Sequence, residues 1–456
     1  MGARAFSAPG KAFLAGGYLV LDPKYMAYVV ALSSRMHAVV RQRGSDTKSS
    51  VSNIVITSPQ FKNGEWLYEI SLDGYHSVKN VCDYNPFLEA TIATSLAYIQ
   101  PEVNFNVAIT IFSDPGYHSQ ANCVKHISNN KNRSFLYHEE PILKVAKTGL
   151  GSSAGLVSVV TAALLAHFNV KIDVNVVHNL AQISHCIAQR KIGSGFDVCA
   201  AVYGSIIYRR FEVSQISELL TRPSDEFQDI RKYNSNLQRV VDLEWDYEHI
   251  ICALPSGIRL LMGDIQGGSE TPKLVSKVLK WKNENQKESE ELYGKLDKAN
   301  KDFIAVLDRI KRAYQDHPQY HSEALEYFSS RSIDDIDANS ATSNPSMVAI
   351  IKLIEVIADI RRNLKQLTLS SGAEIEPHQQ TLLLDHCNTL KGCLGGVVPG
   401  AGGYDAICLL VIEDSVNDII RSSFSDDRFL KVKWLDLHEV ADGIVEEDAT
   451  DYEGLL

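Results

Sequence analysis

The run AKTGLGSSAG at residues 146–155 stands directly before an apolar segment, LVSVVTAALLAHF. The apolar residues of that segment recur at the spacing of one helix face: Leu156, Val159, Val160, Ala163 and Leu164. This pattern predicts a helix over 154–168 with one buried face. A glycine-rich turn before a helix presents free N–H groups at the positive end of the helix dipole, and these bind anions. The sequence therefore predicts an anion-binding turn here.

This run has three other interpretations. Gly149–Ala154 fits the dinucleotide fingerprint G-x-G-x-x-G/A. That motif needs a strand after its helix, whereas the next segment, about 174–190, is itself predicted to be a helix with Asp173 as its N-cap. A Walker motif, G-x-x-x-x-G-K-[ST], is absent from the sequence. A plain helix start with serine caps remains open at this point.

Composition narrows the class of protein. The chain has 456 residues, 45% of them hydrophobic, which predicts a large core and two domains. A net charge of −11 argues against a nucleic-acid partner, because such proteins need a basic face. The eight cysteines show no metal-ligand spacing, so we expect reduced thiols and no zinc site.

The N-terminal sequence MGARAFSAPGK gives no sign of a secretory signal, and Phe6 stands where a myristoylation signal needs Ser or Thr. No apolar run approaches the ~20 residues that span a bilayer. We therefore expect a cytoplasmic protein without a membrane partner. We also expect a monomer.

The first part of the chain is predicted to be mainly strands, followed by helices. Residues 113–140 are polar and are predicted to be a long loop. The helix over 174–190 carries a polar stripe, predicted to be a solvated face: His178, Gln182, His185 and Gln189. A short small-residue helix that Gly204 ends follows, and then a strand, SIIYRRFEV.

A weak polar stretch at about 212–245 marks the predicted division into domains of residues 1–215 and 216–456. In the second half, helices are expected at 272–314 (broken), 345–370 and 378–392, with strands around them. The acidic end, EEDATDYE, is predicted to be a solvated tail. Strands and helices do not alternate regularly, which is typical of an α+β fold.

Three further glycine turns carry chemistry-bearing residues. Lys11 follows Pro9-Gly10, which is predicted to be a turn between apolar segments. Asp197 follows KIGSGF at the start of the short helix, and PGAGGYDA at 399–406 precedes a buried strand. Each signal alone has a plain explanation: a solvated lysine, an acid favoured by the helix dipole, or a strand-entering turn.

The order of these motifs, P-G-K, K-T-G-L-G-S-S-A, G-S-G-F-D and P-G-A-G-G-Y-D, resembles the GHMP kinase superfamily from position 7 to 406. Within that group the residues of these motifs are most similar to those of the fungal-type phosphomevalonate kinases. The resemblance implies an N-terminal domain like domain 2 of ribosomal protein S5 and a ferredoxin-like C-terminal domain with added helices. It implies transfer of the ATP γ-phosphoryl group to 5-phosphomevalonate, with Mg²⁺, on the mevalonate route to isoprenoids and sterols.

Roles follow from the resemblance. The ATP phosphates are expected on Lys147, Thr148, Gly149, Leu150, Gly151, Ser152, Ser153, Ala154 and Gly155. Mg²⁺ is expected at Ser153, then Ser152. Lys11 and Asp197 are the expected catalytic pair. The acceptor is expected to contact Lys11, Tyr18, Ser119, Lys191, Ser194, Gly195, Ala401 and Gly402.

The sequence departs from related mevalonate kinases, which carry a Mg²⁺-binding glutamate on the helix before the catalytic aspartate. Here that helix, HNLAQISHCIAQR, has no acid, so ATP oxygens and water are expected to fill more of the Mg²⁺ shell. Two anionic substrates require a local cationic pocket, for which the candidates are Lys11, Lys147, Arg190 and Lys191.

A phosphate monoester has a second pKa of about 6 and is mostly ionised at neutral pH. Asp197 is therefore expected to orient Lys11, by an ion pair, and the acceptor, with little need to act as a base. The alternatives are mevalonate kinase or another small-molecule GHMP kinase, a catalytically silent sensor with the same fold, and a Rossmann oxidoreductase.

Overall fold

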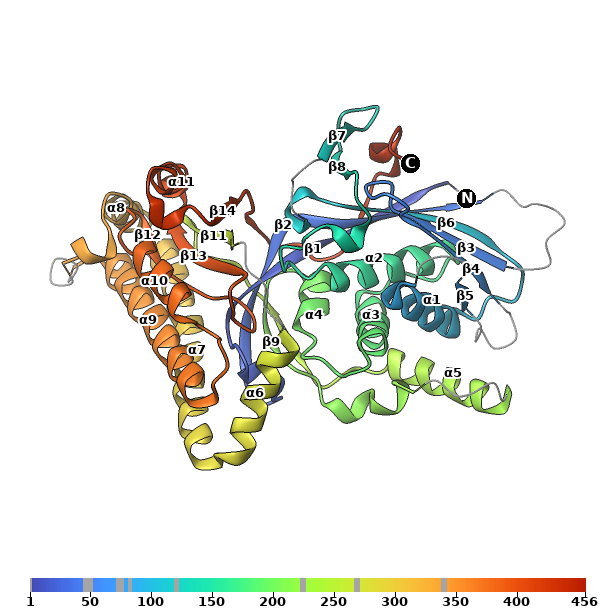
Figure 1. Cartoon of the computed structure of the whole chain (residues 1–456), viewed down its shortest axis with the longest axis horizontal. Coiled ribbons are helices and arrows are strands. Elements are labelled where there is room, and N and C mark those ends of the chain that lie inside the picture. Colours follow the sequence, from blue (N-terminus) through green and yellow to red (C-terminus); the bar gives the residue numbers. More distant parts are fainter. Residues whose placement is uncertain are drawn as a thin grey trace.

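The computed structural model describes residues 2–43, 52–70, 78–80, 84–118, 123–221, 227–265, 271–337 and 343–456. Two sheets, each with helices against one face, lie side by side, and the longest strands of the first sheet reach the helices of the second half (Figure 1). The mixture of a large mostly antiparallel sheet, a small antiparallel sheet and separate helix layers confirms the predicted α+β class.

Ten strands form the first sheet in the described part of the chain. They are β1 (Arg4–Ala15), β2 (Met26–Gln42), β3 (Ser52–Thr57), β4 (Glu65–Ile70), β5 (Val78–Asn80), β6 (Asn106–Ser113), β9 (Ile206–Arg209), β10 (Glu248–Ile251), β15 (Glu439–Val440) and β16 (Val445–Glu447). The path β10-β9-β2-β6-β3-β4-β5 is antiparallel except where β3 runs parallel to β6, and β1 pairs with β2 and β16.

The predicted turn at Pro9-Gly10 is a break in strand register. Residues 4–15 form one strand, and its pairing with β2 shifts between Pro9 and Gly10. Proline has no N–H to donate to a ladder, so an irregularity is favoured there. The consequence is that Lys11 lies within β1, on the rigid sheet, and not on a solvated turn.

Helices pack on one side of this sheet (Figure 1). They are α1 (Pro86–Ile99), α2 (Ser152–His167), α3 (Val174–Gln189), α4 (Phe196–Tyr203) and α5 (Phe227–Asp242), with α5 outermost against α1 and α3. The predicted helices at 154–168 and 174–190 are confirmed, as is the Asp173 cap, whose side chain accepts from the Asn175 N–H at 2.8 Å. Helix α2 is buried on nearly all sides, because apolar and small residues fill its whole length after the first turn.

The prediction that the polar stripe of α3 faces solvent is wrong. His178 and Gln182 are fully buried, and His185 is 3% exposed. The stripe packs against later segments: Asn179, beside it, donates to the Val241 carbonyl at 2.9 Å, and the His178 ring stacks on Tyr247. Partners far along the chain therefore decide which face of this helix is covered.

The second sheet has the topology of a ferredoxin-like domain. Its strands are β11 (Ile258–Ile265), β12 (Cys393–Val397), β13 (Ala406–Ile412) and β14 (Val432–Leu435), in the antiparallel order β12-β13-β11-β14. Chain order strand, helices, strand, strand, helix, strand is the split β-α-β arrangement. The expected ferredoxin-like fold with added helices is confirmed.

The helices of this half are α6 (Thr271–Glu284), α7 (Gln286–Asp316), α8 (Pro318–Ser329), α9 (Pro345–Ser371), α10 (His378–Cys387) and α11 (Val416–Phe424). The expected break within 272–314 falls at Asn285, between α6 and α7. Pro345 at the first position of α9 and the side chain of Asn344 as its cap start that helix where the sequence predicts it.

Strand pairing bears on the domain division expected at residue 215, which stays a prediction. Helix α5 packs against α1 and α3, and β10 pairs with β9 of the first sheet. Near the chain end, β15 pairs with β2 and β16 pairs with β1. From this pairing we propose that the first domain extends to about residue 251 and also includes the residues from 439 onward.

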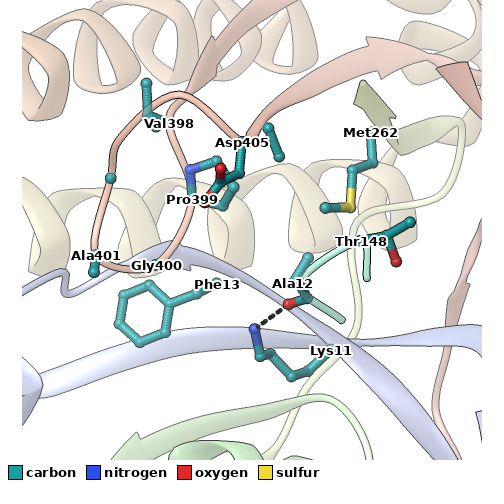
Figure 2. A pocket seen from close by; sticks show the side chains of 13 residues that line it. Lys11, Ala12, Phe13, Thr148, Met262, Val398, Pro399, Gly400, Ala401 and Asp405 are labelled. Atoms are coloured by element: carbon teal, nitrogen blue, oxygen red, sulfur yellow. Dashed lines mark hydrogen bonds between the residues drawn. The ribbon is translucent and has the colours of Figure 1, made fainter. Parts of the chain in front are cut away.

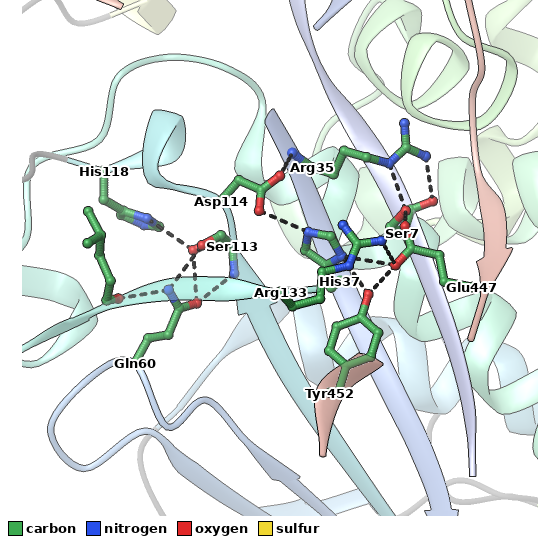
Figure 3. A network of polar contacts seen from close by, with 11 residues as sticks. Ser7, Arg35, His37, Gln60, Ser113, Asp114, His118, Arg133, Glu447 and Tyr452 are labelled. Atoms are coloured by element: carbon green, nitrogen blue, oxygen red, sulfur yellow. Dashed lines mark hydrogen bonds and ion pairs between the residues drawn. The ribbon is translucent and has the colours of Figure 1, made fainter. Parts of the chain in front are cut away.

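The acidic end of the chain is not a solvated tail. Its strand β16 adds to the sheet, and Tyr452 is fully buried. Glu447 meets Arg133 at 2.6 Å and His37 at 3.6 Å, in the network drawn in Figure 3. Burial opposes its ionisation, but His37, with help from hydroxyl groups, lowers the pKa of Glu447 well below its usual range. Attraction to Arg133 and His37 therefore keeps this acidic segment packed against the first sheet.

The predicted long loop at 113–140 contains structure. Strands β7 (Cys123–Ile127) and β8 (Ser134–His138) form an antiparallel hairpin, the two-stranded sheet of the described chain. The polar composition of 113–140 conceals the hairpin, since the side chains of β7 are mostly exposed. No helix within the described ranges is both long enough and apolar enough to cross a membrane.

Candidate active site

The glycine-rich turn at 147–155 has the backbone that its residues predict. Gly149 and Gly151 both have positive φ, +76° and +83°, which favours glycine over residues with a side chain. Gly151 caps α2 without a side-chain hydrogen bond, and α2 begins at Ser152. The plain interpretation, a helix start capped by serine, is therefore not what forms. The first N–H groups of α2 remain available to an anion.

Strand β1 and a short 3-10 helix at Pro115–Tyr117 hold this turn in place. The Lys11 N–H donates to the Leu150 carbonyl at 3.0 Å, and Thr148 donates through its N–H to Tyr117 (3.2 Å) and through its hydroxyl to Gly116 (2.5 Å). A side chain at Gly10 would lie 3.3 Å from the Leu150 side chain, so glycine permits this close approach. The turn is thus a fixed part of the sheet edge.

Lys11 lies across the turn from α2. Its Nζ donates to the Gly149 carbonyl at 2.9 Å and lies 5.8 Å from the centre of the Phe196 ring. Its stem passes Gly151, where an added Cβ would be 3.3 Å from Lys11 Cε. Burial lowers the pKa of Lys11, and the Asp197 carboxylate opposes that shift.

Asp197 stands at the first turn of α4, as predicted. Its Oδ1 accepts from the Val198 N–H at 3.0 Å, and its Oδ2 lies 3.8 Å from His185 Nε2. The expected ion pair with Lys11 does not form within the described residues, where the Lys11 ammonium donates to the Gly149 carbonyl. The two groups are near enough to interact electrostatically but are held by different partners.

Arg210 holds the glycine turn before α4, and no motif in the sequence marked it as a site residue. Its guanidinium donates to the carbonyls of Gly193 (2.7 Å) and Ile192 (3.2 Å). Tyr208 donates to the Ser194 carbonyl at 2.9 Å. Gly195 has φ +85°, and an added Cβ would lie 2.8 Å from the Tyr208 hydroxyl. These contacts fix the position from which Asp197 projects.

Sequence reasoning also missed His185 as a site residue. Its Nε2 lies 3.0 Å from Ser153 Oγ, 3.2 Å from Gln189 Nε2 and 3.8 Å from Asp197 Oδ2. Burial lowers the pKa of His185, the Asp197 carboxylate raises it and Lys191 lowers it. The signal in the sequence was the polar stripe of α3, but spacing alone could not show that the stripe is covered.

Two hollows are lined by different residues of the turn. The larger cavity, of about 310 Å³, has Lys147, Ser152 and Ser153 at one part of its wall. Most of its remaining wall is apolar or aromatic, including Trp66 and Phe87. Burial and the Lys147 charge lower the pKa of His118, also in this wall, to about 4.

The smaller hollow, of about 130 Å³, lies between the two sheets, and we call it the inter-sheet cleft (Figure 2). Lys11, Thr148 and Gly149 line one side of it. The turn 398–402 and Asp405 line the other. Of the residues that line this cleft in the described chain, Lys11 is the one cation.

The turn of the second half is tied to the first sheet. Tyr18 donates through its hydroxyl to the Ala401 carbonyl at 2.7 Å. Gly402 has φ +81°, and an added Cβ would lie 2.2 Å from the Ile375 carbonyl oxygen. The turn is therefore packed between Tyr18 and residue 375, with its backbone facing the cleft.

The structure places some of the predicted site residues in the walls of these hollows: Lys11, Lys147, Thr148, Gly149, Ser152, Ser153, Ala401 and Gly402. Asp197, Leu150, Gly151, Tyr18, Ser194 and Gly195 line neither hollow. Ala154 and Gly155 are buried in the first turns of α2 behind the glycine turn. Arg190 and Lys191 are exposed at the end of α3 and line neither hollow. Ser119 lies outside the described residues.

Comparison with known proteins accounts for this architecture. The family model for the GHMP kinases N-terminal domain matches residues 126–205. A phosphomevalonate kinase from Candida albicans is 48% identical over 99% of this chain and 100% of its own. A phosphomevalonate kinase from Gibberella zeae is 34% identical over 99% of this chain and 98% of its own. The chain belongs to the phosphomevalonate kinases of the GHMP kinase family.

Solved structures agree on the fold. A phosphomevalonate kinase from Streptococcus pneumoniae has a TM-score of 0.60 at 17% identity, covering 96% of this chain and 100% of its own. The mevalonate kinase of Methanococcus jannaschii has a TM-score of 0.55 at 16% identity, covering 96% and 98%. The expected GHMP kinase fold is thereby confirmed.

Proposed function

We propose that this enzyme transfers the γ-phosphoryl group of ATP to 5-phosphomevalonate, giving ADP and 5-diphosphomevalonate. The observation that carries the proposal is the glycine turn at 147–155, whose residues line both hollows. Full-length similarity to phosphomevalonate kinases supports the choice of reaction, and the S. pneumoniae enzyme was solved with phosphomevalonate and AMPPNP.

The larger cavity suits the nucleotide. Its aromatic and aliphatic walls fit a flat base, and Ser152 and Ser153 with the α2 N-terminus lie where phosphates would follow. The inter-sheet cleft suits the acceptor, because its backbone-lined wall and Lys11 offer N–H groups and a positive charge to a compact anion. The γ-phosphoryl group would then be transferred beside Gly149 and Lys11.

Phosphoryl transfer depends mostly on positioning and charge stabilisation. An oxygen of the acceptor phosphate attacks the γ-phosphorus, the bond to the β–γ bridging oxygen breaks, and ADP departs. The acceptor phosphate, with a second pKa of about 6, needs no base at neutral pH. Lys11 stabilises charge on the transferring group. Burial lowers the pKa of Lys11, and Asp197, which orients the acceptor, opposes that shift and so favours the charged form of Lys11.

The protein groups of this site are enough to hold Mg²⁺ only when ATP supplies further oxygen ligands. The candidate protein ligands are the hydroxyls of Ser153 and Ser152 and the single carboxylate of Asp197, and within the described chain no group of three His, Cys, Asp or Glu side chains could hold a metal. Mg²⁺ prefers oxygen ligands and retains several waters. It would enter with ATP and neutralise phosphate charge, with Ser153 as its protein contact.

An acceptor screen tests the proposal. The protein is incubated with ATP and Mg²⁺ and either 5-phosphomevalonate or mevalonate, and ADP and the phosphorylated product are measured. We expect transfer to 5-phosphomevalonate. Transfer to mevalonate alone would establish a mevalonate kinase, and no transfer to either would favour a silent sensor. Cytoplasmic location and a monomeric state stay predictions, and a relative from Arabidopsis thaliana is named as peroxisomal.

The role of Asp197 has its own test. Replacement Asp197→Asn keeps the shape but removes the charge, so we expect kcat to fall by about tenfold without a change in the pH profile. A loss of about a thousandfold, together with disappearance of an acid limb in the pH profile of kcat, would instead make Asp197 a general base.

A further inference from the structure

A single ring nitrogen lies among three side chains of the site. His185 Nε2 is 3.0 Å from the hydroxyl of Ser153 on α2 and 3.8 Å from the carboxylate of Asp197 on α4. Gln189, one turn further along α3, meets the same nitrogen at 3.2 Å. The His185 side chain thus bonds to the start of α2 and lies beside the start of α4.

The surroundings of His185 keep it in that position. The residue is 3% exposed, and its ring lies 5.5 Å from the ring of Phe87, measured between centres. His185 is not among the residues that line either hollow, whereas Ser153 lines the larger cavity. Any influence of His185 on substrates therefore passes through Ser153 or Asp197.

His178 shows that burial on this helix does not by itself imply such a role. It lies two turns earlier on α3 and is fully buried. Its ring stacks on Tyr247 at 4.8 Å, and its Nδ1 meets the Asn179 side chain at 2.9 Å. Among the described residues its ring also contacts Trp245 and Tyr203 but none of the site residues, so it serves as a matched control.

We propose that His185 is a positioning residue for phosphoryl transfer, which holds the Ser153 hydroxyl by a hydrogen bond at a fixed place beside the Asp197 carboxylate. The inference rests on the proposed function. A serine side chain has three staggered rotamers and a rotating hydroxyl hydrogen. A hydrogen bond to a buried ring selects one arrangement before the nucleotide binds. Displacement of such groups by about 1 Å can cost about a hundredfold in rate.

The experiment compares two replacements in steady-state assays with ATP and 5-phosphomevalonate. His185→Gln keeps a hydrogen-bonding group near the place of Nε2, and His185→Phe keeps ring volume without one. We expect His185→Phe to lower kcat by about tenfold or more with the KM for the acceptor within about threefold. We expect His185→Gln to recover most of that loss, and His178→Gln to leave kcat unchanged.

A double-mutant cycle decides whether His185 acts through Ser153. If it does, His185→Phe adds little to the loss caused by Ser153→Ala, and the affinity for MgADP, measured by calorimetry, changes equally in both single variants. If the losses in kcat of the two single variants instead multiply in the double variant, or if the His185→Phe enzyme is as fast as the wild type, His185 has no positioning role. Wild-type turnover of 5-phosphomevalonate in the same assay tests the proposed function separately. Thermal melting is measured for each variant, and His185→Leu takes the place of His185→Phe if the phenyl ring prevents folding.

Discussion

The two hollows beside the glycine turn share a wall but differ in character. The larger cavity encloses about 310 Å³, with walls mostly of apolar side chains such as Ile111 and Leu156. The inter-sheet cleft encloses about 130 Å³ and is lined largely by backbone of small residues, with Lys11 and Asp405 as its charged groups. One hollow buries apolar surface, and the other presents hydrogen-bonding groups and charge.

This difference separates two tasks that one turn must serve. A nucleotide gains most of its affinity from burial of its base, far from the reacting phosphorus. An anionic acceptor has little apolar surface and must be recognised by donors and positive charge. Two lysines flank the turn itself, Lys147 on the cavity side and Lys11 on the cleft side, and Lys62 lines the cavity further away along the chain. The comparison predicts that the two lysines affect different kinetic constants.

The largest expected effect comes from Lys11→Met. The replacement keeps a long apolar stem beside Gly151 but removes the charge, so we expect kcat to fall by about 10²–10³-fold, as for loss of one transition-state donor. The matched variant Lys147→Met is expected to raise the KM for ATP by about fivefold with little change in kcat. Steady-state kinetics at saturating acceptor measure both. Equal effects of the two variants on the same constant would remove the distinction between the hollows.

The next prediction concerns the stability of the folded protein at acid pH, which depends on His118 in the cavity wall. The ordinary histidine pKa is about 6.5, and the pKa of His118 is lowered to about 4 by burial, with Lys147 and His138 adding to the shift. Between these values the unfolded chain binds a proton that the folded chain does not, so stability falls as pH decreases. This one group should cost about 2 kcal/mol between pH 7.5 and pH 5.

Urea unfolding at both pH values, for the wild type and for His118→Gln, checks this expectation. The variant cannot titrate there, so its stability should fall less by about 2 kcal/mol over the same interval. An unchanged pH slope would mean that the cavity wall tolerates charge, contrary to the apolar character assigned to it.

The parts of this site that local sequence signals define were predictable. The positions of Gly149 and Gly151 require a positive φ, and apolar periodicity marks α2 at once after them. Asp173 caps α3 as its residue type favours. The order of four such motifs then indicated the family. The placement of Lys147, Ser152 and Ser153 beside one cavity accords with that local reading.

What could not be predicted depends on partners distant in the sequence. The α3 stripe was expected in solvent because His178 and His185 are polar, but segments near Tyr247 cover one residue and Ser153 meets the other. The acidic end was expected in solvent because of its charge, yet Glu447 meets Arg133 from another part of the fold. Buried polar residues need particular partners, and neither composition nor spacing reveals them.

A bulky side chain in the cavity should affect only the nucleotide. Leu156, on the second turn of α2, forms part of the cavity wall. Replacement Leu156→Trp would fill space that the base needs, and we expect the KM for ATP to rise by about tenfold, a cost of about 1.4 kcal/mol. The KM for 5-phosphomevalonate should stay within about twofold. A parallel rise in both KM values would show that the hollows are not independent.

The smallest expected effect tests the cleft in the same way. Tyr18 donates to the Ala401 carbonyl at 2.7 Å and so ties the turn 398–402 to the first sheet. Replacement Tyr18→Phe keeps the ring but leaves that carbonyl without its donor, a loss of about 1 kcal/mol. Because the turn forms the acceptor wall, we expect the KM for 5-phosphomevalonate to rise by about fivefold while the KM for ATP is unchanged. Tyr18→Phe therefore tests the cleft as Leu156→Trp tests the cavity. A Tyr18→Phe enzyme that loses ATP affinity and keeps acceptor affinity would reverse the assignment of the two hollows.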